Sequence, residues 1–197
     1  MGNTVLNALE AQDPNMRLKA ALHIGTERAA EYVQELVGRF GVEEDFFVRE
    51  MLTWAITRMP AEETVPLLIG RLKVPVAQVR SQSLHTLSKL HDRAPVQIWD
   101  AISDELLLSE DEEVAQAAWR AAVLVVPGEE KVGLAERLAT QFGRGSFERK
   151  RSLTRAFGAL GSEVLVVVDK QSCAHAAATR AWMLEPELDL NALIAEV

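Results

Sequence analysis

Apolar residues recur along this chain with the spacing of one face of an α-helix. The stretch VRSQSLHTL carries small or apolar residues at Val79, Ser83, Leu84 and Leu87. A similar stretch, MRLKAALHIG from Met16, repeats that spacing, which follows the 3.6-residue period of a helix. We therefore expect a series of amphipathic helices, with Leu84 in a buried core.

A basic residue stands near the start of most of these stretches. Six copies align on it, with separations of 32, 31, 35, 35 and 25 residues between the anchors Arg17, Arg49, Arg80, Ala115, Lys150 and His175. The anchor lies just off the apolar stripe, where its stem can pack while its head stays polar. We interpret these arginines as braces for the turn before their own helix. Ligand binding by Arg80 is the alternative.

A second apolar-periodic segment precedes most copies, which indicates helix pairs. The sequence predicts these preceding helices at residues 26–40, with Thr26 as N-cap, and at 61–72, 96–108 and 129–142. Turn residues separate the segments, at Gly25, Gly41, Pro60, Pro95, Pro127-Gly128, Gly145 and Gly161. A single helix pair cannot bury its apolar faces, so neighbouring pairs must stack.

The predicted fold is all-α, a right-handed α-solenoid of about five to six stacked antiparallel helix pairs. We expect a single domain over residues 1–197, with units at 1–25, 26–60, 61–93, 94–127, 128–161 and 162–185 and a C-terminal helix at 186–197. The valine-rich stretch EVLVVVD, from Glu163, would suit a strand by propensity. Its place in the sixth unit predicts a short helix or an extended plug.

These repeats resemble the HEAT repeat family, especially its short bacterial form. The second helix of that family reads roughly V-R-x-x-A-x-x-A-L-G, often with an aspartate shortly before the arginine. Asp13 with Arg17 and Asp45 with Arg49 match, whereas Arg80 lacks the aspartate. The resemblance covers about residues 13–185. It implies an Asp–Arg ladder between repeats and a concave surface lined by the second helices, but it says little about function.

Charge and cysteine content narrow the class of protein. The formal net charge is −8, which argues against a broad affinity for nucleic acid or anionic membranes. No apolar run reaches the roughly 18 residues of a membrane helix. The lone Cys173 cannot form an internal disulfide, so we expect a cytoplasmic protein. Acidic runs beginning at Glu43 and Glu110 fall at predicted helix starts, where capping is favoured over calcium binding.

Few residues have the spacing that catalysis or metal binding needs. Cys173 and His175 could form a thiolate–imidazole pair at a helix start, but their alanine-rich surroundings favour packing. His85 and His91 are six residues apart and fall on different helix faces. We therefore expect no enzyme activity, and no catalytic, cofactor-binding or metal-binding residues.

Two sets of residues are candidates for partner binding. The position five residues after each anchor is expected to form a ridge that suits an acidic or phosphate-bearing partner, and its binding members are Trp54, His85, Arg120, Arg155 and Arg180. Ordinary exposed helix faces are the alternative. A basic patch is predicted at Arg144, Arg149, Lys150 and Arg151. Its alternative is a solvated helix start that pairs with the acidic run from Glu110.

The leading functional hypothesis is a non-enzymatic scaffold that holds an acidic segment of a protein partner on its concave face. We expect it to be a monomer or a weak homodimer. The alternative is a HEAT-like DNA-binding protein or an alkylpurine DNA glycosylase-type repair protein. In that case the ridge would follow phosphates, and the aromatic surfaces would come from Trp54, Trp99, Trp119 and Trp182. The acidic net charge makes nucleic acid the weaker expectation.

Overall fold

A computed structural model describes residues 2–197, with the side chains of residues 4–197. Met1, where the first predicted unit begins, lies outside the described residues. Every regular element within this range is helical, which confirms the all-α prediction. The chain divides into two compact units, here called the N-terminal unit (Met1–Ile98) and the C-terminal unit (Trp99–Val197). The single-domain interpretation stays a prediction, and each unit is described by itself.

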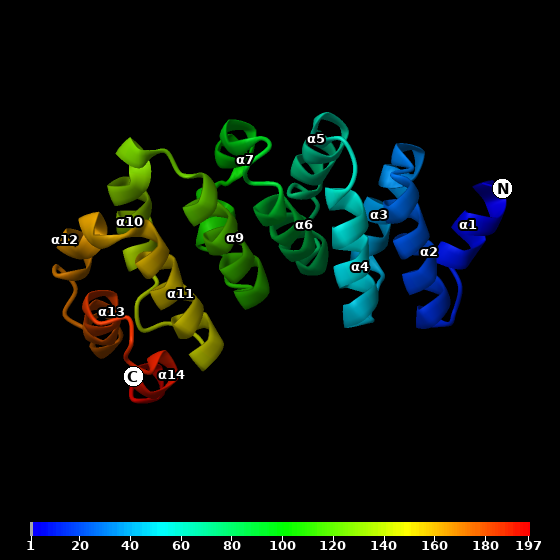
Figure 1. Ribbon diagram of the computed structural model, residues 1–197. Helices are drawn as coiled ribbons and strands as arrows, with labels where there is room; N and C mark the ends of the chain where they lie inside the picture. Colours follow the sequence, from blue (N-terminus) through cyan, green and yellow to red (C-terminus); the bar gives the residue numbers. More distant parts are fainter. Residues whose placement is uncertain (1) are drawn as a thin grey trace. The chain divides into compact units, whose positions relative to one another are not determined.

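The N-terminal unit consists of two layers of helices (Figure 1). Helices α2, α4 and α6 pack side by side in one layer, and α3 packs on α5 in the other. Pairs of successive helices thus stack as the repeat pattern predicts. The elements are α1 (Gly2–Leu9), α2 (Pro14–Glu27), η1 (Ala30–Tyr32), α3 (Val33–Gly38), η2 (Arg39–Gly41), α4 (Phe46–Thr57), α5 (Ala61–Arg71) and α6 (Ala77–Lys89).

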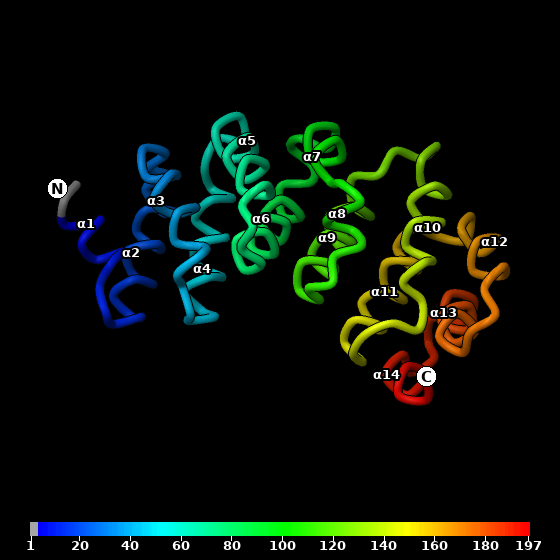
Figure 2. Tube along the Cα trace, turned by 180° about the vertical axis from the view of Figure 1, so that it is seen from behind, coloured from blue at the N-terminus to red at the C-terminus, as the bar shows by residue number. Residues whose placement is uncertain are grey.

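The C-terminal unit has the same plan. Helices α9, α11 and α13 pack in one layer, and α10 contacts both α8 and α12 in the other. Figure 2 shows these helices from behind. The boundary between the units falls within helix α7 (Pro95–Ala101). The remaining elements are α8 (Asp104–Leu107), α9 (Glu112–Val125), η3 (Gly128–Glu130), α10 (Lys131–Ala139), α11 (Phe147–Leu160), η4 (Ser162–Val164), α12 (Leu165–Val168), α13 (Ala174–Leu184) and α14 (Leu190–Ala195).

Aspartates cap several helices of the main layers. The carboxylate of Asp45 accepts the main-chain N–H of Val48, and that of Asp111 accepts the N–H of Val114, both at 3.0 Å. Asp13 caps α2 in a similar way. Such caps satisfy N–H groups that lack a partner inside the helix. The capping role predicted for both acidic runs is confirmed at Asp45 and Asp111.

The predicted helix from Thr26 to residue 40 is wrong at its start. Helix α2 continues to Glu27, and the Thr26 hydroxyl donates to the carbonyl of Leu22 instead of capping a new helix. Arg28, with φ 52°, ends α2 in the left-handed conformation. The following helix is short and flanked by 3-10 turns.

Gly25 is a helix-packing residue, so its predicted role as a turn is also wrong. A Cβ atom there would overlap the ring of Trp54 and lie 2.8 Å from Cα of Ala55 on α4. Gly158 on α11 stands in the same relation to the ring of Trp182 on α13. Each unit therefore uses a glycine to let a tryptophan from the adjacent helix of the same layer approach closely. A sequence contains no local sign that separates this role from a turn.

Other predicted bounds change in length. The helix expected at 96–108 is broken into α7 and α8, and the C-terminal helix is shortened to α14, which Asp189 caps. The valine-rich stretch forms η4 and α12, so the short-helix interpretation is confirmed over the strand. Val164, Val167 and Val168 are buried. The stretch is therefore rich in valine because these side chains pack into the core.

The core of each unit lies between its two layers. Leu84 is fully buried, as the apolar stripe predicts. In the C-terminal unit, Trp119 is the largest buried side chain, and its indole N–H donates to the carbonyl of Leu107 at 2.7 Å. No helix in the described part of the chain has the length and apolar character to cross a membrane.

Candidate interaction site

The anchor arginines of the N-terminal unit donate to carbonyls of the loop before their own helix. Nη1 of Arg17 donates to two such carbonyls at 2.8 Å, and Nη1 of Arg49 to two others at 3.0 and 2.7 Å. Nε of Arg80 donates to the carbonyl of Val74 at 2.8 Å. The predicted bracing role is therefore confirmed for these arginines.

The predicted Asp–Arg ladder is wrong, because a glutamate takes the place of the aspartates. Arg17 donates through Nε and Nη2 to both carboxylate oxygens of Glu43, at 2.7 and 2.6 Å. Nη2 of Arg39 donates to the same carboxylate at 3.0 Å. Asp13 and Asp45 are occupied as helix caps.

Glu43 is buried, and hydrogen bonds from neighbouring groups stabilise its negative charge. Burial by itself would raise the pKa of its carboxyl. Hydrogen bonds from Arg17, Arg39 and the main-chain N–H of Asp45 outweigh that effect and lower the pKa to about 2. The amide of Gln78 on α6 also donates to the Glu43 carbonyl, at 2.8 Å. This cluster holds neighbouring repeats together.

The predicted ridge is only partly basic in the N-terminal unit. Trp54, which is 37% exposed, packs over Gly25, and the guanidinium of Arg58 lies 5.8 Å from the Trp54 ring. Nε2 of His85 lies 3.3 Å from a carboxylate oxygen of Glu50. A carboxylate thus accompanies the histidine on this face.

In the C-terminal unit, the structure brings two ridge arginines together and leaves the third apart. Arg120 on α9 and Arg155 on α11 are exposed and line the same groove. Nε of Arg180 lies 2.7 Å from a carboxylate oxygen of Asp169, and Arg180 is not among the groove residues. Of the three arginines of the predicted ridge, only Arg120 and Arg155 therefore line this groove.

The four residues of the predicted basic patch also lie in different surroundings. Arg149 is buried, because its guanidinium lies 5.3 Å from the Trp119 ring and donates to the Ser109 carbonyl and the Gln141 side chain. It is therefore not a surface residue, and that part of the prediction is wrong. Nζ of Lys150 donates to the carbonyl of Val197 at 2.8 Å. Arg151 lines the groove, and Arg144 is exposed.

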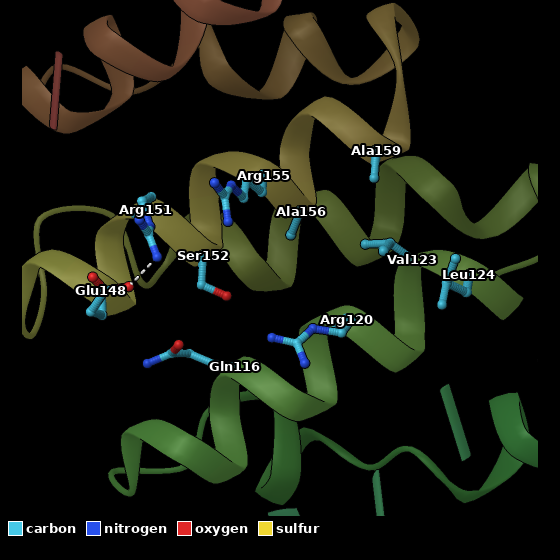
Figure 3. Close-up of a pocket in the computed structure, with 10 residues that line it drawn as sticks. All are labelled: Gln116, Arg120, Val123, Leu124, Glu148, Arg151, Ser152, Arg155, Ala156 and Ala159. Atoms are coloured by element: carbon cyan, nitrogen blue, oxygen red, sulfur yellow. Dashed lines mark hydrogen bonds and ion pairs between the residues drawn. The ribbon is translucent and has the colours of Figure 1, made fainter. Parts of the chain in front are cut away.

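The α9–α11 groove, as we name it, has a volume of about 370 Å³. Figure 3 shows side chains from both helices around one common space, with an ion pair of 2.6 Å between Arg151 and Glu148. Val123, Leu124 and two alanines add an apolar part. The lining residues are Gln116, Arg120, Val123 and Leu124 from α9, and Glu148, Arg151, Ser152, Arg155, Ala156 and Ala159 from α11.

The contacts of His175 argue against a thiolate–imidazole pair with Cys173. Cys173 is exposed, whereas His175 is buried and accepts the main-chain N–H of Gly143 at Nδ1, at 3.0 Å. Nε2 lies 3.1 Å from the carbonyl of Lys150, so both ring nitrogens are occupied. Burial lowers the pKa of His175 to about 4, which keeps the ring neutral. The packing interpretation fits these contacts.

The four tryptophans differ in how much of their rings is accessible. Trp119 is fully buried, and Trp54 and Trp182 pack against glycines of neighbouring helices. The indole N–H of Trp99 donates to Glu130 at 3.3 Å, and the guanidinium of Arg137 lies 5.6 Å from its ring. Only Trp119 of the four is thus fully buried, and it cannot stack on a nucleic-acid base.

Sequence reasoning missed most of the groove. The groove residues of α9 fall at positions 116, 120, 123 and 124, and those of α11 include 148, 152, 155 and 159. Both series follow helical spacing on the face away from the core stripe, so a search for a second stripe would have found them.

Comparisons with known proteins agree with this repeat architecture. Residues 3–88 match the family model described as HEAT repeats, which confirms the predicted resemblance there. Proteins of this kind are generally non-enzymatic scaffolds for protein interaction. No curated protein sequence matches the chain.

Two crystal structures of engineered proteins are similar in fold. One has a TM-score of 0.52 and 19% sequence identity, over 98% of this chain and 96% of that chain. The other has a TM-score of 0.51 and 17% identity, over 98% of each chain. At this identity the likeness shows the fold alone, and it supports the α-solenoid assignment.

Proposed function

We propose that this chain, whose residues 3–88 match the HEAT repeats, is an interaction scaffold that binds an acidic segment of a protein partner in the α9–α11 groove. One observation carries the proposal: Arg120 and Arg155, from neighbouring helices, line a groove that also has apolar walls. This groove takes the place of the longer ridge that the repeat alignment predicts.

The charges of the groove favour an acidic ligand. Three arginines line it with a single carboxylate, that of Glu148, which pairs with Arg151. Within residues 2–197, Arg155 forms no ion pair. The planar guanidinium group can donate two parallel hydrogen bonds to one carboxylate, so a glutamate or aspartate of the partner suits this position.

The apolar part of the groove favours a peptide over a small polyanion. Leu124 is 46% exposed, and it lies on α9 near the end of the groove that Ala159 lines (Figure 3). The small side chains of Ala156 and Ala159 leave room on the α11 side of the groove, where an apolar side chain of the partner can pack. A segment that alternates acidic and apolar residues would use both parts.

The length of the groove sets the size of the segment. Its lining spans positions 116–124 on α9 and 148–159 on α11. At 1.5 Å per residue these stretches are about 12 to 16 Å long. An extended peptide of about four to five residues covers that length.

A direct binding measurement tests the proposal. The probe is a fluorescein-labelled peptide of glutamate and leucine, and its control is a peptide of lysine and leucine, both followed by fluorescence polarisation. We expect the acidic peptide to bind, with an affinity that falls as salt is added. The double substitution R120E/R155E should weaken binding by about tenfold or more.

Arg180→Glu is the control for the single substitution Arg155→Glu, because it makes the same change in charge outside the groove. It should leave binding nearly unchanged. The proposal fails if the parent protein does not prefer the acidic peptide, or if R180E weakens binding as much as R155E. Thermal unfolding of each variant separates loss of binding from loss of structure.

A further inference from the structure

A second cavity, in the N-terminal unit, is lined by three arginines and no carboxylate. It has a volume of about 330 Å³, and we name it the arginine pocket. Arg28 and Arg58 stand at the ends of α2 and α4, and Arg93 follows α6. The lining residues are Arg28, Thr57, Arg58, Met59, Pro60 and Arg93.

None of these three arginines forms an ion pair with a carboxylate anywhere in residues 2–197. Carboxylates are near in sequence, at Glu27, Glu62, Glu63 and Asp92, yet none of them lines the pocket. Three like charges around one cavity repel one another unless an anion lies between them. The pocket therefore has the electrostatic character of an anion site.

The C-terminal ends of helices normally disfavour anions, because their unpaired carbonyl groups point outward. Here Arg93 offsets that effect. Its Nη1 donates to the carbonyl of Thr57 at 2.9 Å and to that of Met59 at 3.4 Å. The partial negative charge at the end of α4 is thus already paired within the protein. No hydrogen bond in the described residues occupies the Nε and Nη2 donors of Arg93.

The backbone at Arg28 is a second and independent observation. Arg28 has φ 52°, and it is the one non-glycine residue in residues 2–197 with positive φ. A left-handed residue at the end of a helix is most often glycine, because a Cβ atom is unfavourable there. Glycine would adopt this backbone conformation more easily than arginine. The presence of arginine at position 28 therefore points to a role for its guanidinium group.

We propose that the arginine pocket binds a phosphate monoester. A carboxylate would match only one of three positive charges, whereas a phosphate monoester carries a charge of about −1.5 to −2 near pH 7. It also offers several oxygens to guanidinium donors arranged around it. The group could come from free phosphate compounds or from a phosphorylated side chain. This site is independent of the α9–α11 groove and of the function proposed for it.

Isothermal titration calorimetry can test this site with three probes. They are inorganic phosphate, a peptide with one phosphoserine, and the same peptide unphosphorylated, with sodium chloride matching the ionic strength. We expect phosphate or the phosphopeptide to bind, and the unphosphorylated peptide not to bind. A phosphopeptide that binds more tightly than phosphate indicates a phosphoprotein partner, and equal affinities indicate a free phosphate compound.

Arg28→Gly is the decisive variant, because it removes a guanidinium while favouring the local backbone. Its melting temperature should equal or exceed that of the parent, whereas binding should weaken by about tenfold or more. Arg58→Gln should weaken binding as well. The double substitution R120E/R155E serves as control and should leave phosphate binding unchanged. The site is disproved if neither phosphate probe binds above the chloride control, or if R28G binds as tightly as the parent.

Discussion

Arg17 and Glu43 form a two-point ion pair that joins α2 to the loop before α4. The Glu43 carboxylate is fully buried, while the Arg17 side chain keeps 12% exposure. The same glutamate also accepts from Arg39. A buried carboxylate that loses its charge leaves these guanidinium groups without their partner, so this contact links repeat packing to pH.

Glu43→Gln should therefore destabilise the protein by about 3–5 kcal/mol, the usual cost of breaking a buried ion pair. Chemical denaturation at neutral pH measures this, with Glu44→Gln at the neighbouring exposed position as control. Because the folded pKa is lowered from 4.5 to about 2, the stabilisation by Glu43 is complete above pH 4.5 and is lost as the pH falls towards 2. Equal stability of E43Q and the parent would contradict the buried-pair interpretation.

His175 should produce a separate loss of stability at higher pH. Its pKa is lowered from 6.5 to about 4 in the folded protein, so the unfolded chain binds the proton first. Stability should be full above pH 6.5 and should fall by about 3 kcal/mol as the pH drops to 4. His175→Gln should flatten this part of the curve, and His23→Gln, at an exposed position, should not. An unchanged curve for H175Q would show that His175 is not the responsible group.

Leu84→Ala should cost about 2–5 kcal/mol, because it opens a cavity among fully buried side chains of the N-terminal unit. Leu124→Ala makes the same change at a position that is 46% exposed, and should shift stability by no more than about 0.5 kcal/mol. Urea unfolding of the two variants gives the comparison. Similar values for both would contradict the burial of Leu84 in the core.

The two glycine–tryptophan contacts predict an unusual response to alanine. Gly25→Ala and Gly158→Ala should each destabilise by about 1–3 kcal/mol, since the new methyl group overlaps a tryptophan ring. Gly70→Ala, on an exposed face of α5 with no atom near the new methyl group, should stabilise by about 0.5–1 kcal/mol. Thermal melts test this, and stabilisation by G25A would rule out the close contact.

The repeat pattern predicts the helices of the main layers well, because their apolar stripes are long. It fails where a distant residue decides the local structure. Gly25 looks like a turn signal until Trp54 is known to cover it, and Thr26 therefore loses its expected role as a cap. The sequence shows Glu43 as part of an acidic run, but its pairing with Arg17 depends on how adjacent repeats stack.

The candidate site was harder to predict than the fold. Arg120 and Arg155 follow from the repeat register, which places equivalent positions of successive helices side by side. Arg180 does not join them, because Asp169, on a short connecting segment, pairs with it. The burial of Arg149 depends on Trp119, a contact between helices that no local pattern encodes.

The short reach of the anchor arginines bears on how the chain folds. Arg17, Arg49 and Arg80 each bind carbonyls five or six residues earlier in the chain. A loop and its helix can therefore close together before any neighbouring repeat is in place. Topologies dominated by such local contacts fold quickly, and stacked repeats can propagate from any starting point. We expect folding to begin in several places along the chain, with repeat stacking as the slower step.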